Sequence, residues 1–200
     1  MRLAEIITDP DAGIDAIAEL LDGLDGGGRW DQVGRLDRAQ QRALYLKATP
    51  DALRVSDLVP GAGLRVEVIH DGLNTLSLPP PLRRFQKRFC RPDEAGSTRL
   101  FGYNEGPTRR LLGPGYFVVT DTDGSPLRGQ STVMVDYYRV PDGPVVDGWP
   151  TVVPNTQGLQ RHVYRETRDL LRRVSAHVSV GAAYKRDEPM DHYFVLCRRT

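Results

Sequence analysis

The sequence has few cysteines and no long apolar run. Cys90 and Cys197 are the two cysteines among 200 residues. Two cysteines do not make a disulfide framework, so we expect both thiols to be reduced and the protein to be cytoplasmic. No run of about 18 apolar residues occurs, so the sequence predicts no membrane-spanning helix. Acidic residues follow soon after Met1, and we therefore expect no signal peptide.

Motifs for nucleotide binding and catalysis are also lacking. The segment 99–124 contains five glycines, but no G-x-G-x-x-G precedes a helix and no G-K-[ST] occurs. The G-x-S-x-G of serine hydrolases and the zinc-binding H-E-x-x-H are missing as well. We interpret the glycines as turn positions, with an anion-binding backbone nest beside Arg109 and Arg110 as the alternative. The turn positions are Gly102, Gly106, Gly113 and Gly115.

Charge is distributed unevenly along a chain whose formal net charge is +1. Residues 1–60 contain 7 Lys or Arg against 11 Asp or Glu, whereas residues 61–200 contain 20 against 15. The N-terminal part is therefore acidic and the remainder basic. Because DNA-binding domains are usually basic throughout, a total charge near zero argues against nucleic acid as the main partner.

Residues 1–60 have the pattern of a helical segment. Asp9-Pro10 is a typical helix start, and apolar residues at helical spacing follow it as far as Leu24. Three glycines then predict the end of this helix. A second helix is expected over 31–48, and a short third one ends before Pro60.

Residues 61–200 contain several stretches that alternate as strands do. The strands are grouped together and do not alternate strictly with helices, which favours an antiparallel sheet. The expected fold class is therefore α+β: a helical N-terminal segment of two to three helices, packed on a mostly antiparallel curved sheet or partial β-barrel with one inserted amphipathic helix. We expect segments 1–60 and 61–200 to form one compact unit. The expected strands are 64–70, 115–122, 131–140, 177–184 and 192–199.

Polar and aromatic residues on these strands predict a pocket for a small organic molecule. In VMVDYYRV, Asp136 and Tyr138 share one face of the strand, which we take as the interior face. A carboxylate in apolar company, or a histidine, would bind a ligand or carry out general acid–base chemistry. The sequence identifies no catalytic motif and no cofactor, so it leaves open whether the protein is an enzyme. The residues expected to line the pocket are Tyr116, Asp136, Tyr138, His177 and His192.

Two rows of cations suggest a different function. On the amphipathic helix expected over 158–174, four arginines recur at spacings of 4, 3 and 4. A short helix expected over 82–90 gives a second row. Either row would suit a polyanion or an acidic protein, although a solvated helix face is the ordinary explanation. The rows consist of Arg161, Arg165, Arg168 and Arg172, and of Arg84, Lys87, Arg88 and Arg91.

A third hypothesis needs no ligand. Acidic residues recur on one face of the first helix, including Asp11 and Asp15, and would mediate self-association as a homodimer or lie against the arginine row. Metal binding has little support, because His162 and Glu166 at i, i+4 lack a third ligand in sequence. We therefore expect no metal site and no membrane partner.

Overall fold

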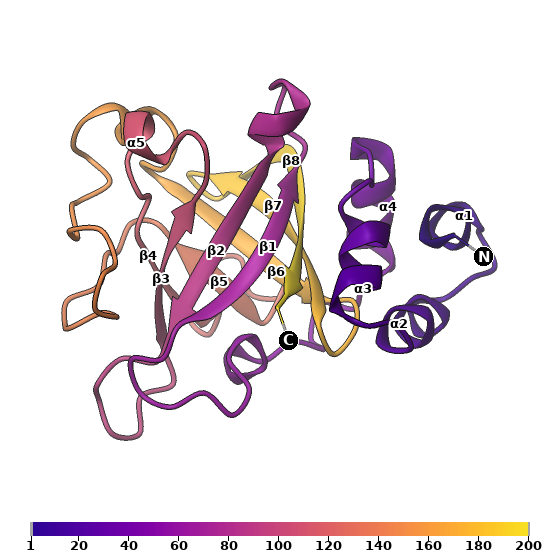
Figure 1. Cartoon of the computed structure of the whole chain (residues 1–200), viewed down its shortest axis with the longest axis horizontal. Helices are drawn as coiled ribbons and strands as arrows, with labels where there is room; N and C mark the ends of the chain where they lie inside the picture. The colour runs from indigo at the N-terminus through magenta and orange to yellow at the C-terminus, as the bar shows by residue number, and fades with distance from the viewer. Residues whose placement is uncertain (1, 200) are drawn as a thin grey trace.

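The computed structural model describes residues 2–199 and, within them, eight β-strands, five α-helices and three 3-10 helices. Figure 1 shows the strands as a barrel with the N-terminal helices beside it. The strands are β1 (Val68–Asn74), β2 (Arg84–Cys90), β3 (Leu100–Glu105), β4 (Phe117–Asp121), β5 (Val133–Asp136), β6 (Thr167–Arg173), β7 (Val178–Lys185) and β8 (Glu188–Arg198). The helices are α1 (Leu3–Thr8), α2 (Ile14–Asp22), α3 (Gly26–Val33), α4 (Arg38–Lys47) and α5 (Arg109–Leu112), with 3-10 helices η1 (Val55–Leu58), η2 (Pro80–Arg83) and η3 (Leu159–His162).

Each strand pairs in antiparallel fashion with the next one along the chain, and β8 also pairs with β1. The sheet is therefore a closed barrel, which leaves no strand edge unpaired. The predicted α+β class with a mostly antiparallel sheet is confirmed, and the barrel is fully closed where a curved sheet or partial barrel was expected. An eight-stranded barrel has an interior just wide enough to be filled by side chains or to hold one small ligand.

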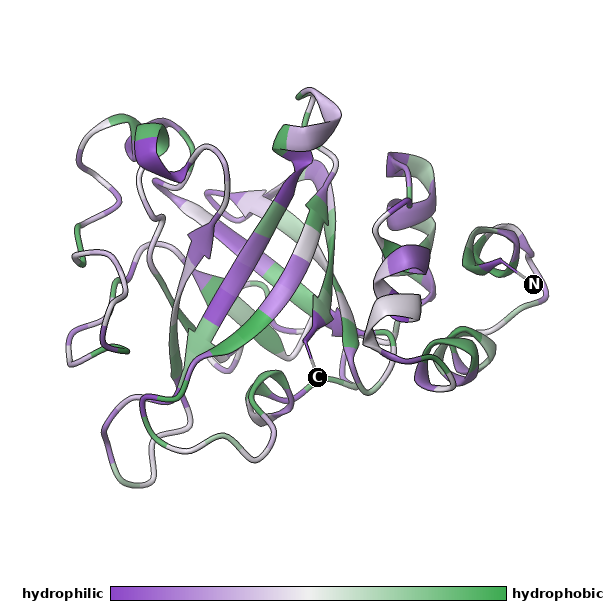
Figure 2. Ribbon diagram, in the orientation of Figure 1, coloured by the Kyte–Doolittle hydropathy of each residue, from purple (hydrophilic) through white to green (hydrophobic). Residues whose placement is uncertain are grey.

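The N-terminal helices cover the outer face of β6, β7 and β8 (Figure 1). Ile17 and Leu21 of α2 and Leu44 of α4 are fully buried. They share one apolar cluster with outward-facing strand residues such as Val180 and Val195. Figure 2 shows apolar and polar residues interleaved along both the helices and the strands. The outer face of this part of the barrel is therefore apolar and buried beneath the helices.

Arg172 of β6 fastens α4 to the barrel. Its Nη1 donates hydrogen bonds to the carbonyl oxygens of Tyr45, at 2.9 Å, and Ala48, at 3.2 Å. Its Nη2 donates to the carbonyl oxygen of Gln130 at 2.8 Å, and its guanidinium lies 4.1 Å from the centroid of the Tyr45 ring. One buried cation thus joins the end of α4, the β4–β5 connection and β6.

Two predicted helices are wrong, because their segments contain strands. The segment 82–90 ends η2 and forms β2, and the segment 158–174 contains η3 and β6. Each strand places a charged side chain inside the barrel, Lys87 in β2 and Asp169 in β6, so neither shows the apolar alternation that indicates a strand. The two cation rows do not form, since neighbours along a strand point to opposite sides.

The helix predicted over 31–48 is divided between α3 and α4. The three glycines open α3 where an interruption was expected, because the Asp25 carboxylate accepts a hydrogen bond from the Gly28 amide at 2.7 Å and caps the helix. The expected short third helix is η1. The first helix is present as α2, and α1 precedes it.

Strands β4, β5, β7 and β8 lie where strands were expected. Strand β1 lies further along the chain than expected and includes Gly72. Glycine is suited to that position, because a Cβ there would lie 2.6 Å from the ring of Phe85. Of the glycines predicted at turns, Gly113 and Gly115 have positive φ, whereas Gly102 lies within β3.

One end of the barrel is closed by η1 and the residues beside it. Leu58 and Val59 are buried against interior residues such as Phe89. His70 of β1 is 3% exposed there, and its Nε2–H donates to the Leu58 carbonyl oxygen at 2.8 Å. Burial lowers the pKa of His70 to about 4, and the hydrogen bond to Leu58 offsets this effect in part. The imidazole is therefore neutral at neutral pH.

We expect His70 to make stability depend on pH between about 6.5 and 4. In that range the unfolded chain binds a proton at His70 and the folded protein does not, so the free energy of unfolding falls as pH falls, by about 1.4 kcal/mol per unit. Urea unfolding of wild type and His70→Gln at several pH values tests this. The variant should show a shallower fall, and parallel curves for the two proteins would contradict the prediction.

Candidate ligand-binding site

The end of the barrel opposite η1 contains a cavity of about 430 Å³. Its mouth is bounded by η2, by the segment that contains α5, and by the residues that follow η3. Figure 1 shows η2 and α5 at the same end of the barrel. Most of the wall is apolar or aromatic. Side chains that form the wall include Leu76, Leu82, Phe85, Leu112, Tyr164 and Phe194.

Two phenylalanine rings separate the cavity from the packed interior. Phe85 and Phe194 meet edge to face, with ring centroids 5.9 Å apart. The Phe194 ring occupies the space that a side chain at Gly181 would need, and the Phe85 ring does the same at Gly72. These inward-facing glycines leave room for the two rings at the barrel wall.

Four polar side chains form the floor of the cavity. Lys87 of β2 is 1% exposed, and its Nζ lies 2.9 Å from Oδ2 of Asp169 in β6, which is 6% exposed. The same Nζ donates to the hydroxyl oxygen of Tyr137 at 2.5 Å and to Oδ1 of Asn104 at 3.1 Å. The Tyr137 hydroxyl donates to Oδ2 of Asp169 at 3.2 Å. We call these four residues the floor cluster.

The floor cluster carries no net charge. Burial lowers the pKa of Lys87, and the Asp169 carboxylate opposes that shift. Burial and the Asp169 charge together raise the pKa of Tyr137 well above its ordinary value, so its hydroxyl stays protonated. The charges of the Lys87 ammonium and the Asp169 carboxylate sum to zero, and the amide of Asn104 adds none.

Three polar groups of the cavity lining are not engaged in this network. Oδ1 of Asp169 and the hydroxyl of Tyr164 make no hydrogen bond to any of residues 2–199. Nδ1 of His192 is buried and has no partner among the same residues. The Tyr164 ring stacks on Tyr137, with centroids 5.2 Å apart and planes 19° from parallel. The cavity therefore offers polar contacts that the protein itself does not satisfy.

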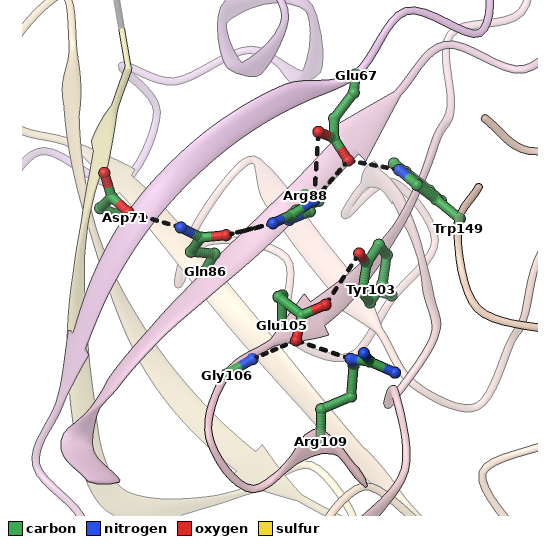
Figure 3. Close-up of polar contacts among 9 residues, drawn as sticks. All are labelled: Glu67, Asp71, Gln86, Arg88, Tyr103, Glu105, Gly106, Arg109 and Trp149. Carbon is green, nitrogen blue, oxygen red and sulfur yellow. Dashed lines mark hydrogen bonds and ion pairs between the residues drawn. The ribbon is translucent and has the colours of Figure 1, made fainter. Parts of the chain in front are cut away.

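Glu105, at the end of β3, holds the segment containing α5 beside the mouth (Figure 3). Its Oε1 accepts hydrogen bonds from Nε of Arg109 at 2.7 Å and from the Gly106 amide at 3.0 Å. Its Oε2 accepts one from the Tyr103 hydroxyl at 3.3 Å. Burial acts to raise the pKa of Glu105, but the hydrogen bonds from Arg109 and Gly106 outweigh it, and the pKa is lowered.

A second chain of contacts crosses the outer face of β1 and β2 (Figure 3). Arg88 pairs with Glu67 at 3.2 Å and donates to Gln86 at 2.8 Å, and Gln86 donates to Asp71 at 3.1 Å. Nε1 of Trp149 donates to Glu67 at 2.6 Å. These contacts attach the long connection between β5 and η3 to the barrel, outside the cavity.

Three of the residues predicted to line the pocket lie on the outside of the barrel. Tyr116 is buried beneath the connection that contains Trp149, and its hydroxyl donates to the Pro150 carbonyl oxygen. Asp136 and Tyr138 also point outward, because Val133 and Val135 of β5 and Tyr137 directly after it face the interior. Asp136 pairs with Arg168 at 3.5 Å, and the Arg168 guanidinium lies 4.6 Å from the Tyr138 ring centroid.

The two predicted histidines lie at opposite ends of the barrel. His177 is in the turn between β6 and β7, where its Nδ1 is 2.9 Å from Nη2 of Arg198. His192 lies in β8 and lines the cavity. His192 is thus the one member of the predicted set of five that borders the cavity, and the structure does not bring the set together.

The four cations of the second predicted row, Arg84 to Arg91, lie apart from one another. Arg84 lies at the mouth and Lys87 on the floor. Arg88 lies on the outer face, paired with Glu67, and Arg91 donates to backbone carbonyls that include that of Ala62.

The four arginines of the first predicted row are dispersed as well. Arg161 and Arg165 are exposed near the mouth. Arg168 pairs with Asp187 at 2.5 Å, and Arg172 is buried beneath α4. Binding of a polyanion by these cations stays a prediction. The cations do not form one continuous surface.

Sequence reasoning missed most of the floor cluster. The sequence predicts a helix over the segment that contains Asp169 and an exposed row that contains Lys87, and it does not place Asn104 among the pocket residues. The available signal is in RFQKRFC, where Phe85 and Phe89 flank Lys87 at i±2. That spacing places all three on one face of a strand, and a lysine between two buried aromatic residues indicates an interior partner of opposite charge.

Comparisons of the chain with protein-family models, with curated proteins and with solved structures find no match. Within residues 2–199, no group of three or more His, Cys, Asp or Glu side chains is arranged to hold a metal ion. None of the helices in the described part of the chain has the length and apolar character needed to cross a membrane. The cavity and its floor cluster are therefore the observations on which a function has to rest.

We expect Lys87 and Asp169 to be far more costly to change singly than together. Lys87→Met leaves an uncompensated carboxylate in the barrel and should lower the free energy of unfolding by about 3–5 kcal/mol. The double variant Lys87→Met/Asp169→Leu removes both charges and should recover most of that loss, since apolar pairs often replace buried ion pairs without a net penalty. Urea unfolding of the three proteins measures this. A double variant less stable than Lys87→Met would contradict it.

We expect Glu105→Gln to loosen the α5 segment. The loss of a charge-assisted bond to Arg109, at a partly exposed site, should accelerate backbone hydrogen exchange over residues 106–113 by about five- to tenfold. Because the pKa of Glu105 is lowered, its contribution should persist in the wild type down to acid pH and disappear only as pH falls through that lowered value. Glu94→Gln, which removes a comparable pairing with Arg99, is the matched control and should leave 106–113 unchanged. Equal exchange in the two variants would contradict the role of Glu105.

Proposed function

We propose that this protein binds one small, largely apolar organic molecule inside the barrel. The observation that carries the proposal is the cavity of about 430 Å³, open at one end and with a polar floor. Cavities of roughly 300–1,000 Å³ that combine an apolar wall with a few polar groups are typical of small-molecule sites.

The arrangement of the barrel ends supports the proposal. The half of the interior next to η1 is filled by aromatic and aliphatic side chains and closed by η1, so it has no room for a ligand. The half of the interior that contains the cavity has a small residue on its wall. Ala183 faces the cavity, directly between Asp169 and His192 in the strand register. A large side chain at 183 would fill the space.

Binding of N-phenyl-1-naphthylamine, an uncharged dye that fluoresces in apolar surroundings, tests the proposal. We expect saturable binding of one dye per chain in a fluorescence titration. Ala183→Phe should weaken that binding by at least about tenfold, because the added ring occupies the cavity. Circular dichroism and thermal unfolding establish that the variant is folded.

Ala176→Phe is the matched control. Ala176 is exposed in the turn between β6 and β7, at the end of the barrel away from the cavity. The same substitution there should leave the dissociation constant unchanged. Equal dye binding by wild type and folded Ala183→Phe, or a parallel loss in both variants, would refute binding inside the barrel.

A further inference from the structure

We propose that the ligand carries an uncharged hydroxyl group, which enters first and binds Oδ1 of Asp169 on the floor. The ligand class is then a phenol or an alcohol with an apolar body. This inference rests on the proposed binding function and goes beyond it, because it assigns the chemistry of the group at the bottom of the cavity.

All three N–H donors of Lys87 are directed at partners within the floor cluster. An ammonium group has three N–H donors. Those of Lys87 are directed at Asp169, Tyr137 and Asn104, at 2.9, 2.5 and 3.1 Å. A carboxylate or phosphate ligand would therefore gain no direct contact with Lys87 unless it broke one of these bonds.

Asp169 keeps one oxygen, Oδ1, as an acceptor for a ligand. Its side chain is 9% exposed. Oδ2 accepts from Lys87 and Tyr137, while Oδ1 accepts nothing from residues 2–199. A carboxylate that borders a cavity with one free oxygen requires a donor, and a hydrogen bond to an ionised group is stronger than one between neutral groups.

The charge of the site favours an uncharged ligand group. The floor cluster is neutral as a whole, and the wall above it is apolar and aromatic. An anionic group at the floor would meet the Asp169 carboxylate, and a cationic group would lie beside Lys87. Either would bury a net charge in surroundings of low polarity, which is costly, whereas a neutral donor would not.

Tyr164 distinguishes a hydroxyl from a simple N–H donor. Its own hydroxyl has no partner among the described residues, and its ring stacks on Tyr137, which contacts Asp169. Burial raises the pKa of Tyr164, and the charge of Asp169 raises it further, so its hydroxyl remains a donor. A ligand hydroxyl is both donor and acceptor, so it satisfies Asp169 and Tyr164 together.

Four compounds with the same ring system test the inference: 2-naphthol, 2-methoxynaphthalene, naphthalene and 2-naphthoate. Their dissociation constants are measured at neutral pH by displacement of N-phenyl-1-naphthylamine. We expect 2-naphthol to bind at least about tenfold more tightly than its methyl ether, because the ether cannot donate to Asp169. The naphthoate anion should bind more weakly than 2-naphthol.

Two variants locate the effect. In Lys87→Met/Asp169→Leu the advantage of 2-naphthol over the ether, measured as the ratio of their dissociation constants in that same variant, should disappear. Tyr164→Phe should reduce that advantage, and Tyr138→Phe, which removes a hydroxyl on the outside of the barrel, should not. Asp169→Asn in the Lys87→Met background is a second route should the apolar pair fail to fold.

The outcomes separate the inference from the proposed function. If all four compounds bind alike and Ala183→Phe blocks them, the cavity is the binding site and the hydroxyl inference is wrong. Tightest binding of 2-naphthoate, or an advantage of 2-naphthol that survives in the double variant, also overturns the inference. If none of the compounds binds and the dye is insensitive to Ala183→Phe, the proposed function itself fails.

Discussion

The ion pair between Lys87 and Asp169 organises the interior of this protein. In a ring of eight strands joined in sequence order, β2 and β6 lie on opposite walls, so the pair spans the barrel. Asn104 from β3 and Tyr137, the residue directly after β5, complete the hydrogen bonding, so residues of three strands and the residue that follows a fourth meet at one polar layer. Below this layer the barrel is filled with apolar side chains, and above it the cavity begins. The pair divides a structural half from a half with space for a ligand.

The same ion pair accounts for the main error of the sequence analysis. The helical N-terminal segment and strands β4, β5, β7 and β8 could be predicted, because their apolar residues follow the period of the element concerned. Strands β2 and β6 could not, because each carries one member of the pair on its interior face. With Lys87 inside and Phe85 and Phe89 beside it, RFQKRFC matches a helical spacing as well as a strand. Only the partner across the barrel, 82 positions away in sequence, resolves the choice.

The position of the site could not be predicted from the sequence for a related reason. Alternation identifies the interior face of a strand when the other face is polar. Here the N-terminal helices cover one side of the barrel, and the connection containing Trp149 covers another, so residues such as Val118 and Val180 are buried on the outside. On β5 both faces are buried, so the pattern of apolar residues does not show that the face of Asp136 points outward. His192 borders the cavity because it lies on the interior face of β8, opposite Ala183.

The pairing of β8 with β1 also determines the order in which the molecule can be completed. The helices made first have their apolar faces buried mainly by β7 and β8, which are made last. Closure, the ion pair and the helical cover all depend on contacts between distant parts of the chain, and such topologies fold slowly. During synthesis the apolar sides of the N-terminal helices therefore stay exposed until the final strands have been made. A chain that lacks β8 loses both the closed barrel and the surface on which its first helices pack.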